Sequence, residues 1–89
     1  MITRAKVSLS AVNDQGQVNT AVLQCNGTDD EIIQFVLANV SALPADATER
    51  YAYVTFWWRD QCNLAFGSKL ISVLDERGLA LWVSCVQEE

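Results

Sequence analysis

Histidine is absent from this chain of 89 residues, and cysteine is scarce: the three present, Cys25, Cys62 and Cys85, lie far apart. The lack of histidine excludes a Ser-His-Asp triad and a histidine general base. The lack of a CxxC pair leaves only distant thiolates and carboxylates as zinc ligands, which is an uncommon set. We therefore predict a protein that is not an enzyme and that holds no metal and no cofactor.

Long apolar runs are also missing. No segment approaches the roughly 18 uninterrupted apolar residues that a membrane span requires. Residues 1–7 alternate polar and apolar side chains and so lack the apolar block of a secretory signal. These absences predict a cytoplasmic protein with reduced cysteines and no membrane segment. Cys25 and Cys85 share the apolar phase of their strands and are expected in the core, whereas Cys62 stands in a turn and is expected to be reachable.

Basic residues are few, because six lysines and arginines stand against eleven aspartates and glutamates, for a formal net charge of −5. This balance opposes approach to phosphate backbones and argues against direct binding to nucleic acid. Two interpretations of the negative charge stay open, namely solubility and imitation of nucleic acid in a partner's phosphate-binding groove. The one dense acidic run, residues 29–31, is explained by the start of a helix.

The first part of the chain has the pattern of a β-hairpin. Residues 3–12 and 17–25 alternate apolar and polar side chains, as half-buried strands do. The sequence Asn-Asp-Gln-Gly at 13–16 favours a turn between them. We therefore predict an antiparallel pair, with Ala21, Leu23 and Cys25 facing the core.

A helix is predicted next, over residues 29–43. Thr28 and Glu31 have the spacing of a capping box, in which each side chain bonds to the other's backbone amide. Apolar residues then recur at helical spacing until Pro44, which marks the end of the helix.

A second, shorter helix is predicted over residues 69–77. Ser68 is positioned to cap its start, and Gly78 stands where a left-handed closing residue is favoured. Residues 51–59 and 79–86 have the pattern of strands, while a brief strand at 64–66 stays an open alternative.

Together these elements predict one α+β domain over residues 1–89, in the order β-β-α-β-(β)-α-β. We expect a mainly antiparallel sheet of four to five strands with both helices on one face, because the helices and strands each have one apolar side to bury.

The strand at 51–59, Tyr-Ala-Tyr-Val-Thr-Phe-Trp-Trp-Arg, cannot bury all of its rings behind one face. Because side chains alternate along a strand, its rings divide between the core and the opposite face, which also receives the tryptophan of the last strand. An uncharged patch of rings and hydroxyls is typical of a binding surface. The alternative is a curled sheet in which the two tryptophans form a second, minor core. The predicted partner-binding residues are Tyr51, Tyr53, Trp57 and Trp82.

The sequences Phe-Trp-Trp at 56–58 and Glu-Arg-Gly-Leu-Ala-Leu at 76–81, with the helix between them, resemble the ending of a family of small bacterial domains of unknown function. The resemblance is confined to the C-terminal part of the chain. It implies a strand-helix-strand ending and carries no functional residue over to this sequence.

A small acidic domain with an aromatic interaction face and no catalytic apparatus is typical of a stoichiometric binder. The first hypothesis is therefore an inhibitor that occupies the working surface of a protein partner, such as a phage anti-CRISPR protein or an immunity protein that neutralises a toxin. The alternative hypothesis is a homodimeric structural domain that buries the same face against its symmetry mate.

Overall fold

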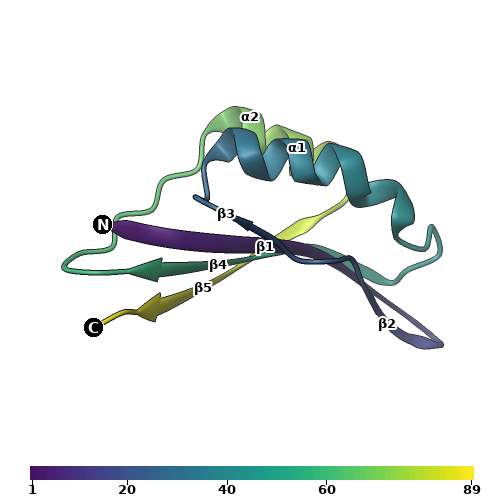
Figure 1. Ribbon diagram of the computed structural model, residues 1–89. Coiled ribbons are helices and arrows are strands. Elements are labelled where there is room, and N and C mark those ends of the chain that lie inside the picture. The colour runs from purple at the N-terminus through teal and green to yellow at the C-terminus, as the bar shows by residue number, and fades with distance from the viewer.

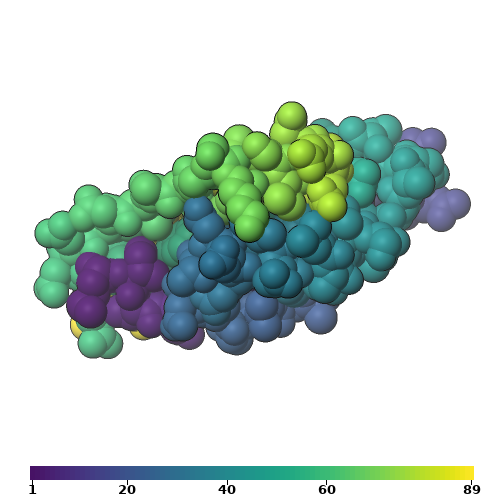
Figure 2. All heavy atoms as spheres, turned by 90° about the horizontal axis from the view of Figure 1, so that it is seen from above, coloured from purple at the N-terminus to yellow at the C-terminus, as the bar shows by residue number.

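The computed structural model covers residues 1–89 and has two layers. Figure 1 shows α1 (Asp29–Asn39) and α2 (Ser68–Glu76) on one side of a five-stranded sheet, with no element on the other side. Seen from above in Figure 2, the helices lie side by side and cover much of the sheet. The predicted α+β fold with both helices on one face is confirmed.

The sheet contains β1 (Ile2–Asn13), β2 (Gly16–Asn19), β3 (Leu23–Cys25), β4 (Glu49–Trp58) and β5 (Ala80–Gln87). Strand β1 lies between β4 and an edge that β2 and β3 share, and β5 forms the opposite edge. All pairs are antiparallel except β4 with β5, which run parallel and are joined through α2. The sheet is therefore mainly antiparallel, as predicted, with one parallel pair.

The returning arm of the predicted hairpin is divided into two short strands. Both β2 and β3 pair with β1, but residues 20–22 leave the ladder between them. Thr20 accounts for the break, because its hydroxyl accepts a hydrogen bond from the Leu9 N–H (2.9 Å) while its own N–H donates to the Leu9 carbonyl (2.9 Å). The prediction that Ala21 and Leu23 lie in the core was wrong, since both are exposed, whereas Cys25 is half-buried on the helix-covered face.

Helix α1 begins with the predicted capping box. The Thr28 hydroxyl accepts a hydrogen bond from the Glu31 N–H (3.2 Å), and the Glu31 carboxylate accepts one from the Thr28 N–H (3.1 Å). The other end of the helix comes earlier than predicted, because α1 gives way to a 3₁₀ turn at Val40–Ala42. Pro44 explains why the 3₁₀ turn does not continue: a residue before proline avoids the helical region, and Leu43 has extended backbone.

Helix α2 differs from the prediction at its start. Its N-cap is Gly67 rather than Ser68, which already belongs to the helix. The capping acceptor comes from another element, since Asp29 Oδ2 in the first turn of α1 accepts a hydrogen bond from the Gly67 N–H (2.7 Å). Gly78 closes the helix with a left-handed φ of +64°, as predicted. The open alternative at residues 64–66 is settled as irregular backbone.

The core lies between the helices and the sheet. Phe56, in the second half of β4, is almost fully buried, and its ring lies 6.2 Å from that of Phe66, which approaches from the segment before α2. At the edge, Leu81 and Val83 of β5 are only half-buried. Besides Phe56, the largest fully buried side chains come from both layers: Val7, Leu9, Ile32, Val36, Val54 and Leu70.

Candidate functional site

The side of the sheet away from the helices carries the predicted aromatic residues. Tyr51, Tyr53 and Trp57 of β4 point to this open face, while Phe56 points to the core, as the alternation along the strand predicts. Trp82 lies on the same face because it pairs with Tyr53 in the parallel register of β4 and β5. We call the four side chains Tyr51, Tyr53, Trp57 and Trp82 the aromatic face.

Three members of the aromatic face form one cluster. The Trp82 ring stacks on Tyr53, with centroids 6.2 Å apart and planes 14° from parallel, and meets Tyr51 at 6.1 Å and 41°. The Tyr51 hydroxyl accepts a hydrogen bond from Gln17 Nε2 (3.2 Å). Trp82 is nevertheless 59% exposed, so the alternative of a minor core around the two tryptophans is not realised. The most exposed large ring of the molecule therefore stands on an ordered aromatic support.

Trp57 is in a different situation. The guanidinium of Arg4 lies over its ring, with Cζ 4.2 Å from the centroid, and Lys6 Nζ lies 5.6 Å from it. Arg4 is held in turn by an ion pair with Glu88 (Nε to Oε2, 3.7 Å). The structure therefore brings three of the four predicted residues together and leaves Trp57 apart under two cations. The alternation predicted for residues 3–12 puts both cations on the polar phase of their strand, but sequence reasoning missed their contact with Trp57.

Hydroxyl groups surround the rings on the open face. The register places Ser8 opposite Tyr53 and Ser84 opposite Thr55. Ser10 is almost fully buried, and its hydroxyl donates to Asn19 Oδ1 (2.6 Å). The face therefore offers rings for apolar contact and hydroxyls for hydrogen bonding, with few groups that carry charge.

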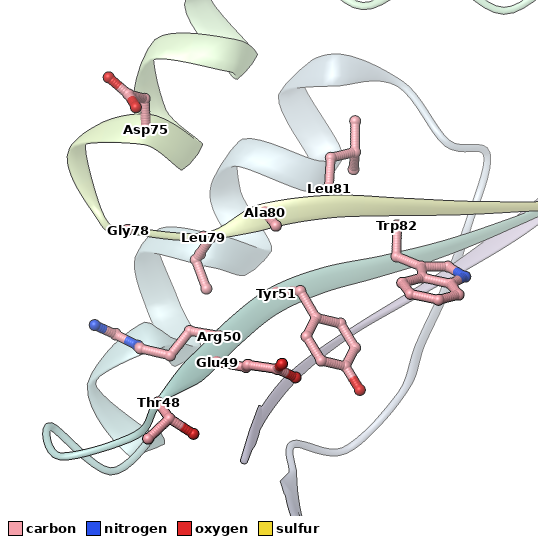
Figure 3. A pocket seen from close by; sticks show the side chains of 10 residues that line it. All are labelled: Thr48, Glu49, Arg50, Tyr51, Asp75, Gly78, Leu79, Ala80, Leu81 and Trp82. Atoms are coloured by element: carbon pink, nitrogen blue, oxygen red, sulfur yellow. The ribbon is translucent and has the colours of Figure 1, made fainter. Parts of the chain in front are cut away.

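A groove of about 630 Å³ adjoins the cluster at the start of β4 and β5. Figure 3 shows that Tyr51 and Trp82 project from one side of these strands and Leu81 from the other, so the groove reaches around the free edge of β5. Arg50 also lines it, and its Nε is buried without a hydrogen-bond partner. Asp75 supplies a carboxylate from the end of α2. Sequence reasoning missed this groove, because it depends on β5 standing at an edge.

Negative charge is not concentrated on the open face. Arg4 and Lys6 lie there, and its carboxylates, Glu49 and Glu88, stand at strand ends. The acidic run at the start of α1 has a local explanation, since Glu31 closes the capping box. Hydrogen bonds, above all from the Thr28 backbone N–H, hold the pKa of Glu31 below its ordinary value of 4.5.

All three cysteines are free thiols. Cys85 follows the helix-facing phase of β5, but this end of the strand projects past the helices in Figure 1, and Cys85 is exposed. The prediction that it lies in the core was therefore wrong. Cys62, predicted to be reachable, is half-buried beside it. Burial, and then the adjacent Cys62 thiol, raise the pKa of Cys85, and burial raises that of Cys25, so both thiols are protonated at neutral pH and are weak nucleophiles.

Nowhere do three or more histidine, cysteine or acidic side chains gather closely enough to hold a metal ion. Neither helix has the length and apolar character needed to cross a membrane. In comparisons with known proteins, no family model, no curated protein and no solved structure matches the chain. Its site has to be interpreted from its own geometry.

Proposed function

We propose that this protein is a non-catalytic binding protein that inhibits a protein partner by covering the partner's working surface with its aromatic face. The observation that carries the proposal is Trp82, a tryptophan 59% exposed on a sheet face that no element of the chain covers. Tryptophan and tyrosine are the side chains most enriched among residues that dominate binding energy. An exposed tryptophan beside two tyrosines is therefore a candidate anchor.

The rigidity of the cluster supports this role. Tyr53 belongs to a strand that is paired on both sides, and Trp82 stacks on it, so binding would immobilise few side chains. Less ordering entropy is then lost on association, which leaves more of the contact energy as affinity. The hydroxyls of Ser8 and Ser84 would supply hydrogen bonds around the anchor.

The choice of a protein as partner follows from the charges. Arg4 and Lys6 are engaged over Trp57, so the open face offers no run of free cations for a phosphate backbone, and the whole chain carries −5. Small size and negative charge are also the features that favour a stoichiometric inhibitor, such as an anti-CRISPR protein or a toxin immunity protein. Occupation of the partner's surface would be the whole mechanism, with no bond made or broken.

The test compares Trp82→Ser with Leu37→Ser, a matched control on the outer surface of α1, where Leu37 is 45% exposed. Proteins captured from host lysate by the wild type are purified, and their affinities for all three forms are measured by calorimetry. We expect Leu37→Ser to bind like the wild type. Trp82→Ser should lose about 2 kcal/mol of binding free energy, roughly a thirtyfold weaker affinity.

Equal affinity of Trp82→Ser and the wild type for the purified partner would contradict the anchor. Retention of nucleic acid instead of a protein would contradict the partner class. The alternative hypothesis, a homodimer through the aromatic face, predicts that the wild type sediments as a dimer and that Trp82→Ser and Tyr53→Ser both sediment as monomers.

A further inference from the structure

Cys62 and Cys85 are distant in the sequence, but the fold brings them together. Cys85 lies near the end of β5, and Cys62 lies in the segment between β4 and α2. Their side chains are close enough for the two thiols to interact with each other. Both thiols are free, and neither belongs to the aromatic face. The pair is therefore a chemically reactive feature that the proposed binding does not use.

The position of Cys62 follows from the turn at the end of β4. Asp60 has a left-handed φ of +64°, and across it the Gln61 N–H donates to the Arg59 carbonyl (2.7 Å), so the chain turns sharply. The Arg59 N–H donates to the Met1 carbonyl (2.9 Å), which ties the turn to the start of the chain. In Figure 1 the segment that follows rises from this turn past the N-terminus to α2. Cys62 thus lies in a segment that runs back over the end of the sheet.

The direction of the Cys62 side chain follows from the burial of its neighbours. Within residues 61–67, exposed and half-buried side chains alternate, and Cys62 and Phe66 are both half-buried. Phe66 packs against the core, with its ring 6.2 Å from that of Phe56. Phe56 is the residue that pairs with Cys85 in the register of β4 and β5. Cys62 is therefore directed to the side of the sheet on which Cys85 lies.

The third cysteine, Cys25, is too far from Cys85 to join the pair. In the register of the sheet, Cys25 pairs with Ala5, and Ala5 pairs with Phe56. Phe56 pairs with Cys85, so three strand spacings of roughly 4.8 Å each, or about 14 Å, separate the two cysteines. A disulfide spans at most about 7 Å between Cα atoms. The fold therefore permits a bond from Cys85 to Cys62 and excludes one from Cys85 to Cys25.

We propose that Cys62 and Cys85 form a site of thiol-disulfide exchange, which low-molecular-weight disulfides such as oxidised glutathione close into an intramolecular disulfide. The exposed Cys85 attacks one sulfur of the reagent as the thiolate, which forms a mixed disulfide and releases one small thiol. Cys62 then attacks the Cys85 sulfur and releases the second small thiol. Two electrons and two protons pass from the pair to the reagent, and an excess of small thiol reverses both steps.

The equilibrium and the rate of this exchange depend on different features of the pair. The second step is intramolecular, so neighbouring thiols present a high effective concentration to each other and favour the closed disulfide over the mixed one. The raised pKa of Cys85 acts on the rate, because little thiolate is present at neutral pH and closure is slow. The pair therefore responds to a sustained rise in the ratio of oxidised to reduced small thiols, rather than to a brief one.

The disulfide would fasten a part of the sheet that is held on one side only. Strand β5 is an edge that pairs with β4 alone, and the bond would join it to the segment before α2. Helix α2 and most of β5 then lie within the closed loop, and a cross-link of this kind stabilises the fold by restricting the unfolded chain. Because β5 carries Trp82, closure would also stabilise the support of the aromatic face.

The first experiment maps the bond in the full chain. The protein, at low micromolar concentration, is incubated with excess oxidised glutathione, alkylated and digested with trypsin, which isolates Cys62 in residues 60–69 and Cys85 in residues 78–89. Mass spectrometry should find these two peptides linked within one chain and Cys25 alkylated. The same treatment in urea should give a mixture of the three possible pairings. The urea mixture in the folded protein, a link to Cys25 or to a second chain, or glutathione retained on Cys85, overturns the proposal.

Thermal denaturation then tests whether the fold holds the two thiols in place, with Cys25→Ser as the control that keeps the pair. Oxidation should raise the unfolding midpoint of the wild type and of Cys25→Ser by roughly 10 °C, and dithiothreitol should reverse the rise. Cys62→Ser should show no rise and should retain glutathione on Cys85. A linked wild type with an unchanged or lowered midpoint would show that the thiols are drawn together from a distance, and overturns the proposal. Neither measurement involves a protein partner, so both results are independent of the proposed function.

Discussion

Gly27, between β3 and the cap of α1, has no side chain because there is no space for one. Its φ is +83°, and a Cβ placed on it would lie 2.5 Å from Phe56 Cε1 and 2.9 Å from Ala5 Cβ. Both neighbours are buried in the core, so neither can move away at low cost. The backbone at this position therefore contacts the ring at the centre of the core directly.

Gly27→Ala should consequently lower the free energy of unfolding by about 2–4 kcal/mol, because left-handed strain and overpacking add together. Gly78→Ala is the matched control: its φ is +64°, but nothing lies within 4 Å of the added Cβ. It should cost about 1 kcal/mol from backbone strain alone. Urea denaturation of both variants measures the difference, and equal losses would contradict the contact with Phe56.

Glu31 gives a prediction about pH. Its pKa is lowered in the folded chain by hydrogen bonds from the Thr28 N–H, so the charged carboxylate stabilises the fold above the unfolded value. That stabilisation is lost as the pH falls through the folded value, below the ordinary 4.5. The wild type should thus exceed Glu31→Gln in free energy of unfolding at neutral pH and converge with it in acid. A difference between the two that does not change with pH would contradict this origin.

Among the site residues, those set by strand parity were predictable and those set by packing were not. Tyr51, Tyr53 and Trp57 were assigned to one face from alternation alone, and the structure places them there. The cover over Trp57 depends on the pairing of β1 with β4, because the regular register from Val12 to Arg4 places Arg4 opposite Trp57. No pattern in the sequence of either strand marks this register.

At the scale of elements, the features with local chemistry were the ones that could be predicted. The capping box of α1 and the turn before β2 depend on residues next to each other in the chain. The cap of α2 could not be predicted, because Asp29, which accepts the hydrogen bond from the Gly67 N–H, is distant from Gly67 in the sequence. The division of the hairpin arm and the parallel pairing of β5 likewise depend on contacts across the sheet.

The link between α1 and α2 can be tested by comparing two neighbouring carboxylates. Asp29→Ala removes the acceptor for the Gly67 N–H and should lower the free energy of unfolding by about 1 kcal/mol. Asp30→Ala removes an equal charge from the same helical turn but no hydrogen bond to α2, and should cost about 0.5 kcal/mol or less. Thermal denaturation of the two variants checks the order, and equal losses would assign the effect to charge alone.

For the whole molecule, net charge and the aromatic face should affect different steps of binding. Charge should affect the rate of association, and the aromatic face should affect the rate of dissociation. The net charge of −5 acts at a distance, while the aromatic face acts only on contact. Toward a basic partner, added salt should slow association and leave dissociation nearly unchanged. Surface plasmon resonance over a series of salt concentrations measures both rates. A dissociation rate that rises with salt as steeply as association falls would contradict an anchor made of rings.

The break at residues 20–22 also has a consequence for aggregation. A sheet with two equally receptive edges can add molecules without end and grow into a fibre. Here the Thr20 hydroxyl accepts a hydrogen bond from a backbone N–H of β1. The strands on either side of it, β2 and β3, are then too short to pair with a further strand. A single threonine would thereby blunt one of the two edges of the sheet, so that copies of the chain cannot add strands at both edges and extend into a fibre.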